Sequence, residues 1–203
     1  MIGVIDYGMG NLHSVEKALQ LLGAPCRRLS SAAMEPDITA LLLPGVGAFD
    51  PAMERLDSLG WSAALKTWTK AERPLLGICL GLQLLFDSSA EGSRQGLGLL
   101  QGRVEPLPPQ DKERCPHMGW APLRPGSRSP LISTNEPASW MYFVHSFAAV
   151  PTDANCITAT APYGRADVVA AVGRGQLQAT QFHPEKSGRC GLDLLQRWLS
   201  SLD

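Results

Sequence analysis

The chain has 203 residues, enough for a single domain over residues 1–203 with a substantial core. Apolar residues make up 44% of it and charged residues 18%, which is typical of a globular protein and excludes a disordered one. The formal net charge is −1 and no block of lysine or arginine occurs, so nothing favours a nucleic-acid or anionic-membrane partner.

The first half of the chain alternates strand and helix patterns. Residues 2–6 predict a buried strand, and the helical spacing of apolar residues over 11–22 predicts a helix that Gly23 ends. Short strands are expected at 25–29, 39–43 and 74–78, with one broken or two short helices at 51–70 around Gly60 and a helix at 80–88. This order predicts an α/β fold with an open, mostly parallel sheet flanked by helices on both faces.

The second half carries mainly short strand patterns, at 103–107, 140–147, 157–163, 168–172 and 177–182. Proline-rich loops at 106–116 and 122–130 separate some of them, and an amphipathic helix is expected at 188–202. The pattern predicts antiparallel strands added to one edge of the sheet. No linker marks a second domain.

Three of the expected strand ends carry residues that can form a site. In open parallel sheets, ligands bind at the carboxyl ends of the strands. Gly8, Gly45 and Cys79 each lie at such an end. We therefore expect three loops to converge on one crevice.

Cys79 stands in the segment Gly-Ile-Cys-Leu-Gly at 77–81, between a strand pattern and a helix pattern. A sharp, glycine-flanked turn at such a junction presents its central side chain at the top of a sheet, as a nucleophile elbow does. A helix N-terminus also favours the thiolate form of a cysteine. The setting predicts a nucleophile for acyl transfer, and a packed core thiol is the plain alternative.

A base for this thiol is offered by His-Pro-Glu at 183–185, directly after the last expected strand. Two residues apart on an extended backbone, His183 and Glu185 lie on the same side, and Pro184 keeps the preceding residue extended. Glu185 can then accept a hydrogen bond from one imidazole nitrogen while the other faces Cys79. The pattern predicts a catalytic triad, with a structural histidine at a strand end as the alternative.

Residues 44–50, Pro-Gly-Val-Gly-Ala-Phe-Asp, follow the third expected strand. Their backbone N–H groups can form an oxyanion hole with the N–H of Leu80, because such holes pair the amide after the nucleophile with one from a neighbouring loop. A simple strand-to-helix turn is the alternative. Residues 8–13 only imitate a dinucleotide-binding fingerprint, since His13 replaces its third glycine and no suitably spaced acid ends a second strand.

The five cysteines form no CxxC pair and the four histidines have no metal-ligand spacing. We therefore expect no disulfide framework, no metal and no cofactor. The N-terminal residues carry no signal-like segment and no apolar run is long enough to span a bilayer. A reduced compartment is expected, and we predict a cytoplasmic location, with a compartment like the plastid stroma as the alternative.

Cys79, His183 and Glu185, in this order, resemble the triad of class I glutamine amidotransferases. The segments 79–83, Cys-Leu-Gly-Leu-Gln, and 181–185, Gln-Phe-His-Pro-Glu, are close to that family's central motifs. The match narrows to the glutaminase subunits of imidazole glycerol phosphate synthase through five segments: 6–11 (Asp-Tyr-Gly-Met-Gly-Asn), 44–49 (Pro-Gly-Val-Gly-Ala-Phe), 116–120 (Pro-His-Met-Gly-Trp), 142–147 (Tyr-Phe-Val-His-Ser-Phe) and 182–188 (Phe-His-Pro-Glu-Lys-Ser-Gly). The resemblance spans essentially the whole chain and implies a flavodoxin-like fold.

The resemblance implies hydrolysis of L-glutamine to glutamate and ammonia through a thioester on Cys79. His183 would act as base and acid, and backbone amides near Val46 and at Leu80 would hold the oxyanion. The residues that would bind the backbone end of glutamine are Gly47, Gln83, His145, Ser146 and Phe147. Phe147 departs from the tyrosine that we expect there, which leaves open whether its side chain or only its backbone matters.

The resemblance also implies a protein partner. Glutaminases of this kind form a heterodimer with a separate (β/α)8-barrel cyclase and deliver ammonia to it. The complex makes imidazole glycerol phosphate and an aminoimidazole carboxamide ribotide in L-histidine biosynthesis. Four residues match the family's docking face: Asn11, Trp120, Tyr142 and Lys186. Composition alone would place Trp120 and Tyr142 in the core.

Two alternatives stay open. The same triad would serve a glutaminase of another synthase, such as that for pyridoxal phosphate, anthranilate or carbamoyl phosphate, although residues 44–50 and 142–147 favour the histidine pathway. A scaffold subunit with a dead site is disfavoured, because the triad is complete. We also hypothesise that the isolated chain is nearly inactive, with the Gly45–Val46 peptide turning its carbonyl to the oxyanion site until the cyclase binds.

Overall fold

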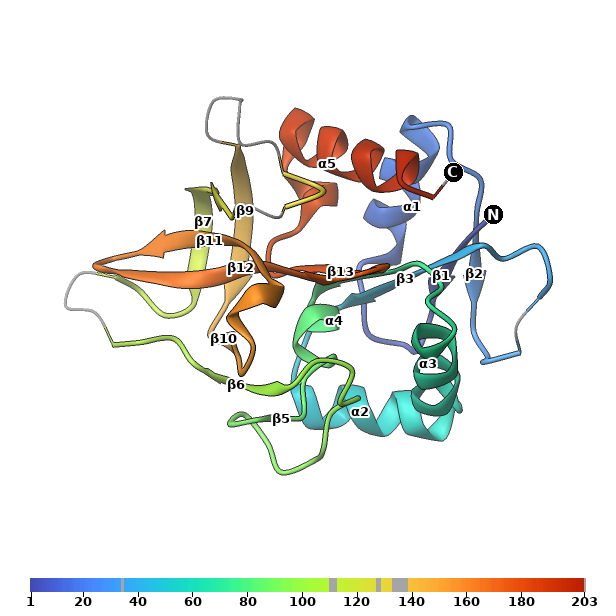
Figure 1. The fold of residues 1–203 in the computed structure, drawn as a ribbon, viewed down its shortest axis with the longest axis horizontal. Helices are drawn as coiled ribbons and strands as arrows, with labels where there is room; N and C mark the ends of the chain where they lie inside the picture. The colour runs from blue at the N-terminus through green and yellow to red at the C-terminus, as the bar shows by residue number, and fades with distance from the viewer. Residues whose placement is uncertain (34, 110–112, 127–128, 133–138, 203) are drawn as a thin grey trace.

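The computed structural model describes residues 1–33, 35–109, 113–126, 129–132 and 139–202. An eight-stranded sheet forms its centre, with helices on both faces (Figure 1). In spatial order its strands are β2 (Cys26–Leu29), β1 (Ile2–Ile5), β3 (Ala40–Gly45), β4 (Leu75–Cys79), β13 (Leu177–Thr180), β12 (Ala166–Arg174), β11 (Ile157–Tyr163) and β8 (Arg124–Pro125). The first five run parallel and the last three add antiparallel pairs at one edge, which confirms the expected sheet.

The helices found in the described ranges are α1 (Leu12–Leu21), α2 (Phe49–Ser58), α3 (Trp61–Lys70), α4 (Leu80–Gln83) and α5 (Gly188–Ser200), with 3-10 turns η1 (Ala154–Cys156) and η2 (Pro184–Lys186). Helices α1 and α5 cover one face of the sheet, and α2 and α3 the other (Figure 1). The helix pattern over 51–70 is two helices, because Gly60 takes a left-handed φ of 77° between them.

Two smaller sheets stand beside the main one. One contains β10 (Phe147–Pro151), β6 (Gly102–Pro106) and β5 (Ser88–Ser89), and the other pairs β7 (His117–Pro122) with β9 (Trp140–His145). The prediction of one continuous strand over 140–147 is therefore wrong. It breaks at Ser146, whose carbonyl accepts a hydrogen bond from the Leu107 N–H at 2.9 Å, and the chain continues in the other sheet. Residues 110–112 and 127–128 of the expected proline-rich loops lie outside the described residues.

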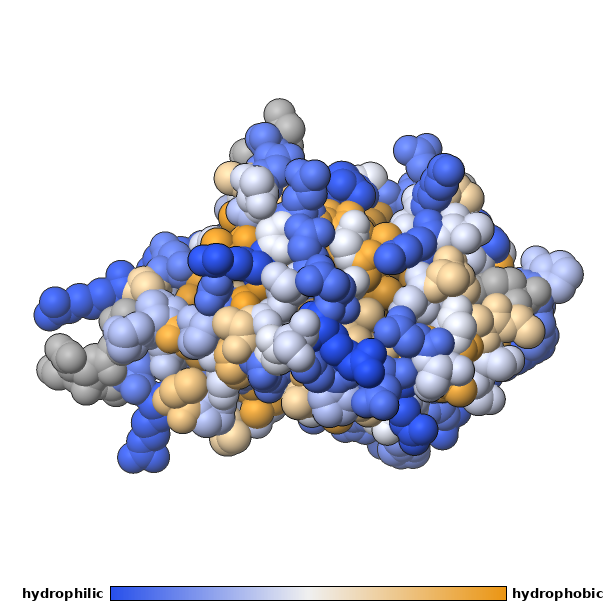
Figure 2. All heavy atoms as spheres, turned by 90° about the horizontal axis from the view of Figure 1, so that it is seen from below, coloured by the Kyte–Doolittle hydropathy of each residue, from blue (hydrophilic) through white to orange (hydrophobic). Residues whose placement is uncertain are grey.

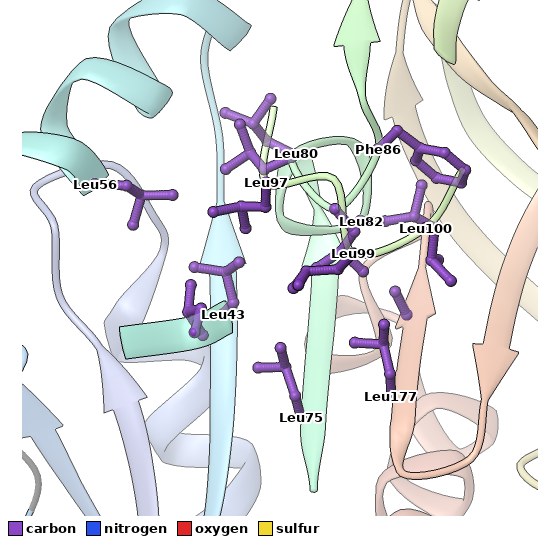
Figure 3. Packing of buried hydrophobic residues seen from close by; sticks show 14 of the residues in the cluster. Leu43, Leu56, Leu75, Leu80, Leu82, Phe86, Leu97, Leu99, Leu100 and Leu177 are labelled. Carbon is purple, nitrogen blue, oxygen red and sulfur yellow. The ribbon is translucent and has the colours of Figure 1, made fainter. Parts of the chain in front are cut away.

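The core beneath the sheet joins strand leucines to the short helix α4. Leu43, Leu75 and Leu177 point from β3, β4 and β13 toward Leu80 and Leu82 of α4 (Figure 3). All five side chains are almost fully buried. Burying a leucine side chain stabilises a fold by roughly 2 kcal/mol, so this cluster anchors α4 on the sheet.

The helix expected at 80–88 is only four residues long. A neighbouring loop takes the carbonyls that a longer helix would use: the N–H of Leu97 donates to the Leu84 carbonyl at 2.9 Å, and the N–H of Leu99 to the Leu85 carbonyl at 2.8 Å. Backbone polar groups in a buried segment must find partners. Here the partners come from the loop, so α4 stops early.

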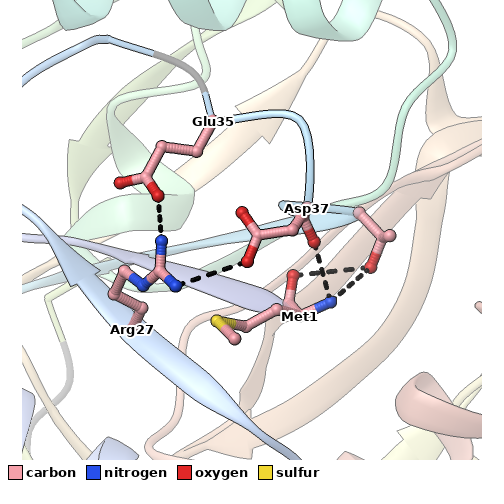
Figure 4. Close-up of polar contacts among 5 residues, drawn as sticks. Met1, Arg27, Glu35 and Asp37 are labelled. Atoms are coloured by element: carbon pink, nitrogen blue, oxygen red, sulfur yellow. Dashed lines mark hydrogen bonds and ion pairs between the residues drawn. The ribbon is translucent and has the colours of Figure 1, made fainter.

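Polar contacts tie the N-terminus to the sheet edge. The terminal amine of Met1 donates to the Asp37 carbonyl at 3.0 Å and to the Thr39 hydroxyl at 3.2 Å, while Arg27 pairs with Glu35 and Asp37 (Figure 4). Exposed ion pairs of this kind contribute at most about 1 kcal/mol each. They define where β1 begins rather than hold the fold together.

The face that looks downward in Figure 1 carries protruding polar side chains with hydrophobic residues in scattered patches between them (Figure 2). Within the described ranges, no helix has both the length and the apolar character needed to cross a membrane.

Gly81 lets α4 pack on β3. A Cβ at this position would lie 2.0 Å from the Leu43 carbonyl oxygen, a backbone atom held in the sheet. We expect Gly81→Ala to lower the free energy of unfolding in urea by about 3 kcal/mol. In the matched control Gly10→Ala, the new Cβ would meet nothing closer than 3.4 Å. Gly10→Ala should lower the free energy of unfolding by less than about 1 kcal/mol. Equal decreases in the two variants would contradict the steric role assigned to Gly81.

Candidate active site

Cys79 occupies the strained turn that the sequence predicts. It ends β4 with φ 56° and ψ −109°, a conformation that residues other than glycine rarely adopt. A Cβ on Gly77 would lie 3.0 Å from the Gly81 carbonyl oxygen, so both flanking glycines are needed to bring the first turn of α4 this close. The tight packing therefore turns the Cys79 side chain into a pocket, where Cys79 is 7% exposed.

His183 and Glu185 form a hydrogen bond in which ring Nδ1 donates to carboxylate Oε1 at 2.8 Å. The expected extended backbone is correct at His183 (φ −101°, ψ 94°) but wrong beyond it. Pro184–Lys186 form η2, closed by the Lys186 N–H donating to the His183 carbonyl at 3.0 Å. A proline-initiated 3-10 turn, rather than alternation along a strand, brings the carboxylate to the ring.

The electrostatics of this pair favour a charged imidazole. The His183 ring is 2% exposed and the Glu185 side chain 1%. Burial lowers the pKa of His183, but its interactions with Cys79 and Glu185 outweigh burial and raise this pKa to about 9. Nε2 has no hydrogen-bond partner among the described residues, and it shares the pocket with Cys79. The raised pKa means that the imidazolium formed when Nε2 takes the thiol proton is stabilised in this site.

The loop after β3 borders the same pocket. Gly45 pairs with Cys79 in the parallel register of β3 and β4, so the loop that begins at Val46 leaves the sheet next to the end of β4. Val46, which is 40% exposed, lines the pocket together with Leu80 and with Gly47, whose φ is 104°. The two residues of the expected oxyanion hole, Val46 and Leu80, thus line the same pocket as Cys79.

Tyr7 supports this loop from behind. Its hydroxyl would lie 2.6 Å from a Cβ on Gly45, so only glycine fits there. The hydroxyl is buried without a hydrogen-bond partner in the described structure. Burial, and then the charge of Cys79, raise the pKa of Tyr7 well above its usual value, so the phenol stays neutral.

The pocket has a volume of about 460 Å³, within the range of small-molecule sites. We call it the Cys79 pocket. It is lined by Cys79 and His183 and by all the residues expected to hold glutamine: Gly47, Gln83, His145, Ser146 and Phe147. Within the described residues, no group of three or more His, Cys, Asp or Glu side chains is placed to hold a metal ion.

The backbone carbonyl of Phe147 organises one wall of the Cys79 pocket. It accepts hydrogen bonds from Gln83 Nε2 at 3.0 Å and from His145 Nδ1 at 2.9 Å. Burial lowers the pKa of His145 to about 4, so its ring is neutral at pH 7. Because Nδ1 donates to the carbonyl, Nε2 accepts from Nδ1 of His117 at 3.3 Å. These bonds use the backbone of residue 147 and need no side-chain hydroxyl there.

Two site residues were missed by the sequence analysis. Glu91 lines the Cys79 pocket and its Oε2 accepts from the Phe49 N–H at 2.9 Å, at the start of α2. It lies in a loop whose position no periodicity predicts. Gln181 places its Nε2 3.9 Å from the Cys79 sulfur. Its place two residues before His183 was the available signal, since alternate residues of a strand share a face.

The four expected docking residues lie on neighbouring elements. Trp120 of β7, 52% exposed, is paired in register with Tyr142 of β9, and their rings meet edge-on at 6.0 Å. The core reading of Trp120 is therefore wrong. Asn11 caps α1, which contacts η2, where Lys186 lies. The Tyr142 carbonyl accepts from the His183 N–H at 3.0 Å, which joins this surface to the triad.

A family model for class I glutamine amidotransferases matches residues 3–199. Solved structures share this fold: one titled glutamine amidotransferase has a TM-score of 0.76 at 19% identity and covers 99% of this chain and 97% of its own. PurLQS from Thermotoga maritima has a TM-score of 0.74 at 19% identity, covering 100% of this chain and 98% of its own. Fold and site together define a class I glutamine amidotransferase.

Curated relatives narrow the family further. An imidazole glycerol phosphate synthase subunit HisH of Synechococcus sp. (strain CC9605) is 56% identical over 99% of this chain and 94% of its own. A subunit HisH 2 of Prochlorococcus marinus (strain MIT 9313) is 52% identical over 100% of this chain and 95% of its own. The chain belongs to the HisH family of imidazole glycerol phosphate synthase subunits.

The raised pKa of His183 can be measured directly. We expect the ring to titrate near pH 9 in NMR spectra, and Glu185→Gln to move the midpoint down, because it removes the carboxylate that favours the cation.

The same shift predicts a pH dependence of stability. The unperturbed value is 6.5, so the contribution of His183 is fully present below about pH 6.5 and is lost as the pH rises through about 9. Urea unfolding across this window should show a steeper fall of stability with pH in the wild type than in Glu185→Gln. If stability fell equally steeply with pH in both proteins, the raised pKa of His183 could not be attributed to Glu185.

Proposed function

We propose that this chain hydrolyses L-glutamine on Cys79 and passes the ammonia to a separate cyclase subunit of imidazole glycerol phosphate synthase in L-histidine biosynthesis. The observation that carries this proposal is the meeting, in one pocket, of the strained Cys79 with the hydrogen-bonded His183–Glu185 pair. Identity of 56% to a HisH subunit over nearly the whole chain supports the pathway.

The first half-reaction forms a thioester. His183 Nε2 takes the proton of Cys79 while Sγ bonds to the side-chain amide carbon of glutamine. Glu185 stabilises the imidazolium through the 2.8 Å hydrogen bond, and the N–H groups of Val46 and Leu80 hold the oxyanion. Nε2 then gives its proton to the amide nitrogen, the C–N bond breaks, and ammonia leaves.

The second half-reaction restores the thiol. A water molecule gives a proton to His183 Nε2 while its oxygen bonds to the thioester carbon. The C–S bond breaks and glutamate leaves. The proton on Nε2 returns to Cys79, so the site ends as it began and needs no cofactor.

The α-amino end of glutamine is a cation and its α-carboxylate an anion. Glu91 is the acidic side chain that lines the described part of the Cys79 pocket, and we assign it to the α-ammonium group. Gly47, Gln83, His145, Ser146 and Phe147, which also line the pocket, complete the proposed glutamine site.

The product ammonia must be protected from water, because protonation would remove its nucleophilicity. The proposed docking face for the cyclase consists of Trp120, Tyr142, Lys186 and Asn11, and the bond from His183 to Tyr142 joins it to the triad. We also propose that the complex works in the cytoplasm.

The decisive experiment measures glutamate release from L-glutamine by the purified chain, alone and with the cyclase and its nucleotide ligand. We expect strong turnover only in the liganded complex and at least a thousandfold loss in Cys79→Ala, on the order of what removing a triad nucleophile costs. Cys156→Ala, which removes another buried thiol, is the control. Activity that survives in Cys79→Ala would refute the mechanism, and equal turnover without cyclase would refute the coupling.

Glu91→Gln tests the substrate assignment. The variant keeps an oxygen for the Phe49 N–H but loses the charge, so we expect KM for glutamine to rise about tenfold with little change in kcat. The control is Asp50→Asn, because Asp50 bonds the backbone N–H groups of Ser93 and Arg94 without lining the pocket. A KM change of equal size in both variants would assign Glu91 a purely structural role.

A further inference from the structure

Gln181 lies between β13 and the triad histidine and is completely buried. Its backbone N–H donates to the Ala170 carbonyl of β12 at 2.8 Å, which fixes the residue against the sheet. Its side chain reaches Cys79, with Nε2 3.9 Å from Sγ, a long hydrogen bond to a large sulfur atom. Neither half-reaction of glutamine hydrolysis uses this contact.

A chain of hydrogen bonds determines which end of the Gln181 amide faces the sulfur. The Phe147 carbonyl can only accept, so the Gln83 atom 3.0 Å from it must be Nε2. The same Nε2 lies 3.0 Å from Gln181, so the Gln181 atom there must be the acceptor Oε1. The opposite end, Nε2, therefore donates toward Cys79.

We propose that Gln181 is a positioning and thiolate-stabilising residue for Cys79, its amide held in the donating orientation by Gln83 and the Phe147 carbonyl. This inference rests on the proposed role of Cys79 as nucleophile. A donor at the sulfur favours the charged form. It also restrains Sγ on the side of β13, so the sulfur cannot turn freely away from His183.

None of the ionisable groups near the sulfur takes over the role proposed for Gln181. His183 and Glu185 lie on the turn after β13, where the imidazolium supplies one positive partner. Tyr7, on the β1 side, stays neutral. His145 lines the pocket and is neutral at pH 7. Glu91 also lines it, but its carboxylate accepts a hydrogen bond from the Phe49 N–H at the start of α2. Among the described side chains, the one whose hydrogen-bond geometry reaches Sγ as a donor is that of Gln181.

The test is the pH profile of Cys79 alkylation by iodoacetamide in the full-length chain, with the modified peptide quantified by mass spectrometry. Gln181→Met keeps the volume and removes the donor. We expect its midpoint to rise by about one pH unit, so that alkylation below the midpoint is about tenfold slower. Gln178→Met is the matched control, because Gln178 is a buried glutamine of β13 that bonds the Gly175 carbonyl. Its profile should match the wild type.

An unchanged profile in Gln181→Met would overturn the proposal. Should that variant not fold, the wild type provides a second measurement: the side-chain amide resonances of Gln181 should shift with the Cys79 titration, while those of Gln178 stay constant. Flat Gln181 resonances would overturn it equally. Alkylation needs no turnover, so these outcomes are independent of the glutamate-release assay that tests the proposed function.

Discussion

The close approach of the first turn of α4 to the backbone of β3 is the constraint on which the site depends. It forces Cys79 into a left-handed conformation, and such strain costs on the order of 1–3 kcal/mol. Burial of Leu80 and Leu82 against the sheet leucines, at roughly 2 kcal/mol per side chain, offsets that cost. Glycines at 77 and 81 leave room for α4 to pack this closely on the sheet. The packing that builds the core therefore also presents the nucleophile.

The topology of the sheet assembles the rest of the site around this turn. Strands β1, β3, β4 and β13 are parallel neighbours, so their carboxyl ends meet at one edge. Gly45 and Cys79 are the last residues of β3 and β4, and Tyr7 and His183 follow the ends of β1 and β13. The small β7–β9 sheet borders this site, because Val144 and His145 of β9 line the pocket and the Tyr142 carbonyl accepts a hydrogen bond from the His183 N–H. The proposed docking surface is thus built onto the triad.

A backbone carbonyl, rather than a side chain, organises the polar wall of the pocket. The Phe147 carbonyl orients both Gln83 and His145, and through Gln83 it orients Gln181 at the sulfur. Buried polar networks of this kind require every member to have a partner, which fixes the amide and imidazole orientations uniquely. A phenylalanine at 147 is compatible with this network because the network never uses its ring.

The sequence by itself determined the alternation of strands and helices, the parallel sheet with its antiparallel edge, and the grouping of Cys79, His183 and Glu185. These follow from local periodicity, glycine and proline positions and motif order, all of which act over a few residues. Only the tertiary structure decided that α4 ends at Gln83 and that the strand over 140–147 divides at Ser146. It alone also decided that Glu91 lines the pocket and that the Gln181 side chain reaches the Cys79 sulfur. Each of these depends on hydrogen bonds to segments distant in the chain, which no local pattern encodes.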